Sequence, residues 1–289
     1  MSAKIIDGKD IARRVREDWK IHADRLKAAG ITPGLAVIML GDNAASQVYV
    51  RNKIKACQDI GIFSIAHLLP AATPQAEVLE LIDRINVDPR IHGLLVQLPL
   101  PPQMDVQTVI ERIALEKDVD GFSLYNVGGL VTGGTVFPPC TPYGVVCMLE
   151  YSNIPITGQN VVVVGASNIV GKPMALMLMQ KEATVAICHV KTRDLAQFTI
   201  LADILVVAAG KPGLITAPMV KTGAVVIDVG INRLADGTLV GDVDFDAVKE
   251  KASYITPVPG GVGPMTVTML LCNTIQSAER SAAKLGIRT

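Results

Sequence analysis

A phenol and an amine stand four residues apart in a segment whose apolar spacing predicts a helix over 46–59. They are Tyr49 and Lys53. Residues four apart share one face of a helix. Burial lowers the pKa of an amine toward neutrality, so a lysine beside a tyrosine at the margin of a cleft can transfer protons. Taken alone, the pattern favours an ordinary surface lysine beside a half-buried tyrosine.

Further polar residues follow at two places in the chain. Gln97 stands near the end of the apolar run 93–98, and Asp118 and Asp120 flank a valine in the segment 117–121. Ligands of α/β proteins bind at the carboxyl ends of strands, so a polar residue there is a candidate contact. A satisfied glutamine at a sheet edge and aspartates that cap a turn explain these residues equally well.

The segment 161–174 predicts a nucleotide-binding turn. Its four valines indicate a strand buried on both faces, and apolar residues at helical spacing follow from 169 to 180. A turn of small residues, Gly165 to Asn168, lies between them. A strand, a tight turn and a helix present backbone N–H groups and a helix N-terminus to a phosphate.

Three known motifs compete for this turn. A P-loop requires a hydroxyl residue after its lysine, and Pro173 stands there and cannot hold a metal ion. A hydrolase elbow fails because Ile169 replaces its last glycine. The dinucleotide fingerprint is matched loosely, since Ser167 replaces its second glycine and Gly171 comes one residue late. For the turn taken alone, a glycine turn without a ligand remains an alternative.

A second constrained loop covers residues 257–266. It holds three glycines and three prolines between the last predicted strand and the last predicted helix. Such a loop is rigid, and its backbone can approach a ligand closely. A plain connector needs no such density of constrained residues.

Composition narrows the class of protein. The chain has 289 residues, 49% hydrophobic and only 4% aromatic, which is typical of aliphatic α/β cores. Lys plus Arg equals Asp plus Glu at 27 each, so no net charge favours nucleic acid or a basic partner. The N-terminus lacks the apolar core of a signal peptide, and no apolar run of about 18 residues predicts a membrane helix. Five cysteines without metal-site spacing indicate reduced thiols and a cytoplasmic protein.

The elements that must position these residues alternate between strands and helices, which predicts an α/β fold with mostly parallel sheets. The first series consists of helices over 10–29, 46–59 and 77–86 and strands over 34–40 and 91–98. A passage rich in Gly and Pro over 120–142 and a helix over 143–151 lead to the second series. Its strands are 161–164, 183–189, 204–209, 224–229 and 253–256, and a helix over 266–285 ends the chain.

The motifs occur in an order that resembles the bifunctional methylenetetrahydrofolate dehydrogenase/methenyltetrahydrofolate cyclohydrolase family, of the bacterial FolD type. They are the segments 49–53, 96–101, 117–122, 165–171 and 259–266, and the resemblance covers residues 4 to about 275. It implies a folate-binding catalytic domain over 1–121, completed by the helix 266–289, and a Rossmann domain for NADP over 140–265. It also implies a homodimer and two reactions, the oxidation of 5,10-methylenetetrahydrofolate by NADP⁺ and the hydrolysis of the methenyl product to 10-formyltetrahydrofolate.

The resemblance implies roles for particular residues. Those with catalytic roles are Tyr49, Lys53, Gln97 and Asp120. Asp120 would bind the pterin ring, and Lys53 would shuttle protons in the hydrolysis. Further folate contacts would come from Val96, Leu98, Pro259, Gly260, Gly261, Val262 and Gly263. NADP contacts would come from Gly165, Ala166, Ser167, Val190, Lys191, Arg193 and Ile231. No metal is implied.

The residues after the second Rossmann strand predict NADP rather than NAD. An acid at the end of that strand grips the ribose 2′-hydroxyl of NAD, but here the first acid, Asp194, comes five residues later. Lys191 and Arg193 can pair with a 2′-phosphate instead. Two positions depart from the family, since Gly129 and Val190 stand where many members have longer or polar side chains. Another two-domain dehydrogenase and a non-catalytic NADP-binding regulator are the rival interpretations.

Overall fold

The computed structural model describes residues 2–287, except for the side chains of residues 44 and 45. The chain forms two compact units. Unit 1 comprises Met1–Arg13 and Thr141–Thr266, and unit 2 comprises Arg14–Cys140 and the chain from Val267 on. Within the described residues, no helix is long and apolar enough to cross a membrane.

Unit 1 is built on a six-stranded parallel sheet in the order β1-β11-β8-β7-β5-β6. Its strands are β1 (Lys4–Ile5), β5 (Asn160–Val164), β6 (Thr184–Cys188), β7 (Ile204–Val207), β8 (Val225–Asp228) and β11 (Tyr254–Ile255). Its other elements are α6 (Cys140–Tyr151), α7 (Gly171–Gln180), α8 (Ala196–Thr199), η2 (Ala217–Met219), α9 (Phe245–Lys249) and the hairpin of β9 (Asn232–Arg233) and β10 (Leu239–Val240). The strand order reverses beside β5, and such a point is where doubly wound sheets bind ligands.

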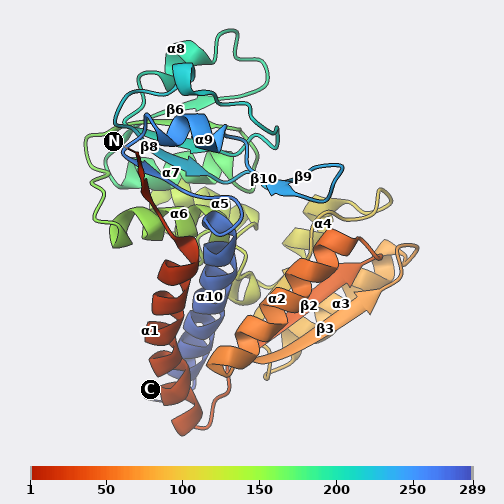
Figure 1. The fold of residues 1–289 in the computed structure, drawn as a ribbon. Coiled ribbons are helices and arrows are strands. Elements are labelled where there is room, and N and C mark those ends of the chain that lie inside the picture. Colours follow the sequence, from red (N-terminus) through yellow and green to blue (C-terminus); the bar gives the residue numbers. More distant parts are fainter. Residues whose placement is uncertain (1, 288–289) are drawn as a thin grey trace. The chain divides into compact units, whose positions relative to one another are not determined.

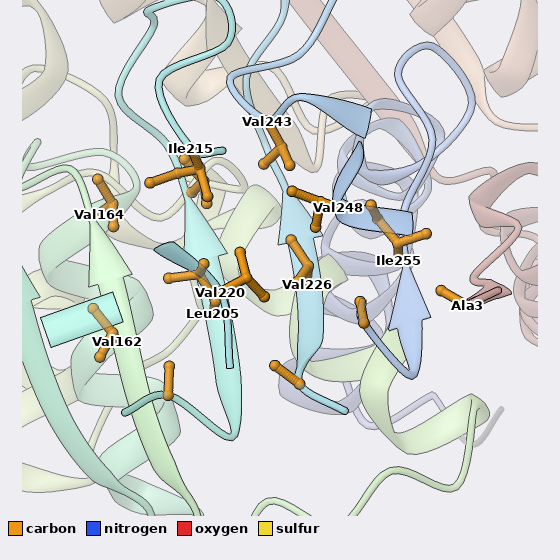
Figure 2. Close-up of a cluster of buried hydrophobic side chains, with 14 of the residues drawn as sticks. Ala3, Val162, Val164, Leu205, Ile215, Val220, Val226, Val243, Val248 and Ile255 are labelled. Carbon is orange, nitrogen blue, oxygen red and sulfur yellow. The ribbon is translucent and has the colours of Figure 1, made fainter. Parts of the chain in front are cut away.

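Alternate residues of these strands fill a core on one face of the sheet. Val162 and Val164 of β5 point the same way because side chains alternate along a strand. In Figure 2 they belong to one cluster with side chains of β7, β8 and β11 and with Val248 of α9. All of these side chains are less than a tenth exposed. The core therefore fixes the strands whose carboxyl ends carry the loops of unit 1.

Unit 2 contains a three-stranded parallel sheet in the order β3-β2-β4, of which β2 and β3 are labelled in Figure 1. Its strands are β2 (Gly34–Leu40), β3 (Phe63–Leu69) and β4 (Gly93–Val96). Its helices are α2 (Ala44–Ile60), α3 (Gln75–Val87), α4 (Val106–Glu111), η1 (Leu115–Lys117) and α5 (Leu124–Thr132). The buried side chains of α3 and α4 pack with alternate residues of β2 and β4 in one core. The remaining side chains of the fully buried β2, such as Val37, point to the opposite face.

Two long helices, α1 (Gly8–Ala28) and α10 (Val262–Lys284), run from one unit into the other. Within unit 2 they are joined by a hydrogen bond from Arg16 to the Thr268 hydroxyl, 2.8 Å long. The Asn273 amide of α10 donates to the carbonyl of Val119 at 2.8 Å, and the Ser277 hydroxyl donates to the carbonyl of Glu116 at 2.7 Å. These bonds tie α10 to the segment that carries Asp120.

The predicted two-domain α/β fold is confirmed, and two local predictions were wrong. Strand β3 was missed because it lies at a sheet edge and is only partly buried, so it lacks a continuous apolar run. The passage 120–142 contains α5, whose start is capped by the Ser123 side chain. The predicted folate domain includes residues 1–13, whereas the structure pairs Lys4 and Ile5 with β11 in the sheet of unit 1.

Candidate active site

Lys53 is the most buried charged side chain of α2, only 7% exposed. Tyr49 lies one turn earlier on the same helix and is half-buried. The Lys53 amine donates to Oε1 of Gln97 at 2.9 Å. The structure thus rejects the surface-lysine interpretation and brings together two residues 44 positions apart.

Gln97 is placed by the sheet. It follows the last residue of β4, Val96, and its backbone N–H donates to the carbonyl of Ile38 on β2 at 2.8 Å. Its side-chain amide donates to the carbonyl of Leu98 at 2.7 Å. Since this bond fixes which end of the amide carries the oxygen, Oε1 faces Lys53. Gln97 therefore has hydrogen-bond partners, as a glutamine at a sheet edge requires, and it remains a candidate ligand contact as well.

Helix α2 begins and ends where the sequence provides caps. The Asn43 side chain accepts a hydrogen bond from the N–H of Ser46 at 3.0 Å, as an N-cap residue does. Gly61 ends the helix with φ 75°, the left-handed conformation that glycine adopts without strain. These caps fix the register in which Val50, Lys53 and Cys57 all face inward.

The two aspartates of the segment 117–121 have different roles. Asp118 is 1% exposed, and its carboxylate accepts from the backbone N–H groups of Gly121 and Ser123 and from the Asn126 amide. Asp118 therefore builds the turn. Asp120 is left to face Lys53, whose charge interacts with it. The turn interpretation holds for Asp118 and not for Asp120.

Burial and mutual attraction set the pKa values of Lys53 and Asp120. Loss of solvent is the largest effect on both groups: it lowers the pKa of the Lys53 amine and raises the pKa of the Asp120 carboxyl. The charge of each group opposes the shift of the other. An amine and a carboxyl whose pKa values approach each other in this way can pass a proton between a substrate and themselves.

Two thiols complete the surroundings of Lys53, and the sequence did not predict them. Cys57 lies one helical turn after Lys53, and burial raises its pKa to about 12. Cys140 is 1% exposed, lies beside Asp120 and donates to the carbonyl of Val119 at 3.3 Å. Burial raises its pKa well above the ordinary value, so both remain neutral thiols and are poor nucleophiles. The spacing of four residues could have indicated Cys57, but no local signal points to Cys140.

The glycine turn of unit 1 is as tight as the sequence predicts. Gly165 has φ 120°, and a Cβ there would lie 2.1 Å from the carbonyl oxygen of Ala208. A Cβ at Gly171 would lie 2.0 Å from the carbonyl oxygen of Gly165. The Ser167 hydroxyl accepts from the N–H groups of Val170 and Gly171 at 3.1 and 3.4 Å. Ser167 thus orders the entry into α7 without needing to be glycine.

The segment after β6 forms an exposed turn. The N–H of His189 donates to the Thr192 hydroxyl at 2.9 Å, and the N–H of Lys191 donates to Nδ1 of His189 at 3.1 Å. Val190 is 95% exposed. The side chains of Lys191 and Arg193 are exposed as well, and neither has an acidic partner among the residues that the structure describes.

The constrained loop after β11 leads directly into α10. Gly260 has φ 108°, and a Cβ at Gly261 would lie 2.5 Å from the carbonyl oxygen of Pro257. A Cβ at Gly263 would meet Cδ1 of Ile231 at 3.6 Å, so two of the predicted contact positions adjoin. Within the described part of the chain, no group of three or more His, Cys, Asp or Glu side chains could hold a metal ion.

Family models match both the part of the chain that holds the Lys53–Gln97 pair and the part that holds the Gly165 turn. A family model described as the tetrahydrofolate dehydrogenase/cyclohydrolase catalytic domain matches residues 6–120, and one described as the NAD(P)-binding domain of the same enzymes matches 139–282. The chain belongs to the tetrahydrofolate dehydrogenase/cyclohydrolase family. In this family match, the Lys53–Gln97 pair lies in the catalytic domain and the Gly165 turn in the NAD(P)-binding domain.

Full-length relatives of this family are similar throughout. The chain is 64% identical over 285 residues to the bifunctional protein FolD of Nitrosospira multiformis, covering 99% of each chain. It is 60% identical to that of Moorella thermoacetica, covering 97% of this chain and all of the relative. The FolD crystal structure from Campylobacter jejuni is 50% identical, with a TM-score of 0.95 over 97% of this chain and 100% of that one. The Trypanosoma brucei enzyme, solved with NADP and an inhibitor, is 39% identical with a TM-score of 0.95, covering 98% and 99%.

Proposed function

We propose that this protein oxidises 5,10-methylenetetrahydrofolate with NADP⁺ and hydrolyses the resulting 5,10-methenyltetrahydrofolate to 10-formyltetrahydrofolate. The observation that carries the proposal is the buried Lys53 amine, paired with Gln97 and facing Asp120, in a chain of this family. The rival dehydrogenases of other substrates do not account for this cluster.

Lys53 is the proposed proton carrier of the hydrolysis. Water adds to the methenyl carbon, and its proton passes to the neutral Lys53 amine. The bond from that carbon to N5 then breaks, Lys53 returns its proton to N5, and the remaining hydroxyl proton is released to solvent as the carbonyl of the N10 formyl group forms. The lowered pKa of Lys53 makes a neutral amine available for the first step. Gln97 holds the amine in place, and Tyr49 is a proposed substrate contact on the same helix face.

Asp120 is the proposed anchor of the pterin ring. A carboxylate can accept hydrogen bonds from the exocyclic amine and a ring N–H of an aminopyrimidine. Val96 and Leu98 flank Gln97 and are proposed to contact the same substrate. Pro259, Gly260, Gly261, Val262 and Gly263 remain proposed substrate contacts from the constrained loop.

NADP⁺ supplies the hydride acceptor of the oxidation when it is bound. The backbone of Gly165 and Ala166 and the α7 N-terminus, whose entry Ser167 orders, are the proposed diphosphate contacts, because a tight strand–turn–helix presents backbone N–H groups to a phosphate. Lys191 and Arg193 fit a 2′-phosphate because they are exposed and lack an acidic partner in the described chain. Val190 and Ile231 are proposed apolar contacts of the cofactor.

We also propose a folate-binding domain over residues 1–121, completed by the helix 266–289, and a Rossmann domain over 140–265, together with a homodimer and a cytoplasmic location. These proposals follow from the family.

A spectrophotometric assay tests the proposed function. The purified protein is mixed with 5,10-methylenetetrahydrofolate and NADP⁺, and NADPH formation is followed by absorbance. In a second assay, methenyltetrahydrofolate is supplied directly and its disappearance is followed without cofactor. The proposal predicts both reactions, and the absence of either one contradicts it.

A further inference from the structure

A pair of buried carboxylates, Asp228 and Asp242, lies at the carboxyl edge of the unit 1 sheet. Asp228 is 3% exposed and Asp242 is fully buried. Among the described residues, neither forms a salt bridge with a lysine, arginine or histidine. Burying a carboxylate without a cation is costly unless hydrogen bonds compensate for the lost water. The hydrogen bonds of the pair therefore show what the carboxylates hold in place.

The Asp242 carboxylate accepts four N–H hydrogen bonds from two loops. Its Oδ2 accepts from the backbone N–H groups of Ala209 and Gly210 at 2.7 and 2.9 Å. Its Oδ1 accepts from the N–H of Lys211 at 2.9 Å and from the Asn232 amide at 2.8 Å. Three successive N–H groups after β7 and one side chain after β8 thus converge on one carboxylate.

Asp228 fixes Asp242 in turn. Its Oδ1 accepts from the backbone N–H groups of Gly230 and Asp242, both at 3.0 Å, and its Oδ2 accepts from the N–H of Val243 at 2.9 Å. The two carboxylates pack directly against glycines. A Cβ at Gly230 would lie 2.3 Å from the Asp242 carboxyl carbon, and one at Gly241 would lie 1.9 Å from an Asp228 oxygen.

The pair also connects with the proposed cofactor site. Ala208 immediately precedes the segment held by Asp242, and its carbonyl oxygen is the atom against which Gly165 packs. On the other side, Ile231 lies between Gly230 and Asn232 and adjoins Gly263. A shift of the segment 209–211 or 230–232 would therefore move groups next to the glycine turn and the constrained loop.

The strand order indicates which half of a bound dinucleotide would lie beside the loops after β7 and β8. The sheet runs β8-β7-β5-β6 at this point. With the diphosphate at the turn after β5 and the adenosine over the end of β6, the nicotinamide half must lie over the ends of β7 and β8. Those are the loops that Asp242 holds.

We propose that Asp242 is a positioning residue for hydride transfer, which fixes the loops after β7 and β8 so that the nicotinamide is held in one orientation. The inference rests on the proposed NADP-dependent oxidation. Hydride transfer depends steeply on alignment, and a displacement of about 1 Å can cost about 100-fold in rate. The hydrolysis needs no nicotinamide, so its rate reports on the rest of the protein.

Asp242→Asn tests the proposal in the full chain. An amide keeps one acceptor oxygen, so either the Ala209 and Gly210 pair of donors or the Lys211 and Asn232 pair loses its acceptor. We expect the kcat for methylenetetrahydrofolate oxidation at saturating NADP⁺ to fall about 30-fold or more. Hydrolysis of supplied methenyltetrahydrofolate should stay within about threefold, and the isotope effect on kcat with deuterated methylene substrate should rise because hydride transfer becomes slower than product release.

Asp203→Asn is the matched control, since Asp203 precedes the amino end of β7 and its carboxylate accepts from the N–H of Asn160 and from Lys221. Both activities should stay within about twofold of wild type there. If Asp242→Asn does not fold, Asn232→Ala tests the proposal in its place, because it removes one hydrogen-bond donor to Asp242. It should lower the kcat of the oxidation by about 3- to 10-fold and leave the hydrolysis unchanged.

Equal losses of both activities in the deciding variant would make Asp242 a purely structural residue and overturn the inference, as would an unchanged kcat for the oxidation. Failure of the proposed function would be recognised separately, because the wild-type protein would then lack the NADP-linked oxidation itself.

Discussion

Replacing Lys53 by methionine separates the two proposed reactions. Methionine keeps much of the length and apolar volume of the lysine stem but has no amine. The Lys53 amine is the proposed proton carrier of the hydrolysis, whereas hydride transfer requires alignment more than acid–base help. Lys53→Met should therefore abolish methenyl hydrolysis while the variant still forms methenyltetrahydrofolate and NADPH.

The structure allows the effects of Lys53→Met on the hydrolysis rate and on the free energy of unfolding to be estimated. A positioned acid–base group contributes about 100- to 10,000-fold, so hydrolysis should fall within that range. The variant loses the 2.9 Å bond to Gln97, worth about 1 kcal/mol, and leaves the buried Asp120 without the cation that faces it. It also loses the cost of burying an amine that is only 7% exposed, which offsets part of this loss. We expect the free energy of unfolding to fall by no more than about 3 kcal/mol.

Lys55→Met provides the matched control, because Lys55 lies on the same helix and is exposed. Hydrolysis of methenyltetrahydrofolate is followed by absorbance across a pH series for wild type and both variants. Since burial lowers the pKa of Lys53 and the neutral amine is the proposed base, wild-type kcat should rise with pH through that lowered pKa. The rise should persist in Lys55→Met and disappear in Lys53→Met. A folded Lys53→Met protein with normal hydrolysis would refute the role of Lys53.

Three further predictions follow from the same structure. Asp120→Ala should weaken folate binding about tenfold or more and leave NADP⁺ binding intact, as measured by titration calorimetry; an equal loss of NADP⁺ binding would make Asp120 structural. Lys191→Ala with Arg193→Ala should erode the preference for NADP⁺ over NAD⁺ through NADP⁺ affinity, and an unchanged kcat/KM ratio would contradict this. Burial raises the pKa of Asp228 to about 6, above the 3.8 of an ordinary carboxyl, so its contribution to stability is present below pH 4 and is lost as pH rises through 6. The stability advantage of wild type over Asp228→Asn should therefore shrink by about 3 kcal/mol between pH 3 and 7 in denaturant titrations, and a constant difference would contradict the shift.

The sequence was most informative where a residue's neighbours are local. The turn at Gly165 could be predicted because its strand, glycine and helix are contiguous, and α2 because its apolar spacing and Gly61 are explicit. The roles of Asp118 and Asp120 could not be separated, because the difference depends on which carboxylate meets the N–H groups of residues 121 and 123.

The remaining features depend on contacts between distant segments. Cys140 reaches the surroundings of Lys53 through the fold alone, and Asp242 accepts hydrogen bonds from the segment 209–211, more than 30 residues earlier in the chain. Strand β1 was missed because two residues, Lys4 and Ile5, carry no periodic signal and are ordered only by pairing with β11.

The most direct test of the proposed function follows individual atoms through both reactions. The wild-type protein is incubated with NADP⁺ and tetrahydrofolate whose methylene bridge carries two deuterium atoms, and the products are analysed by mass spectrometry. The proposed function predicts one deuterium at C4 of the reduced nicotinamide and one on the formyl group of 10-formyltetrahydrofolate. Unlabelled NADPH, or a labelled methenyl product that is never converted to the formyl compound, would contradict it.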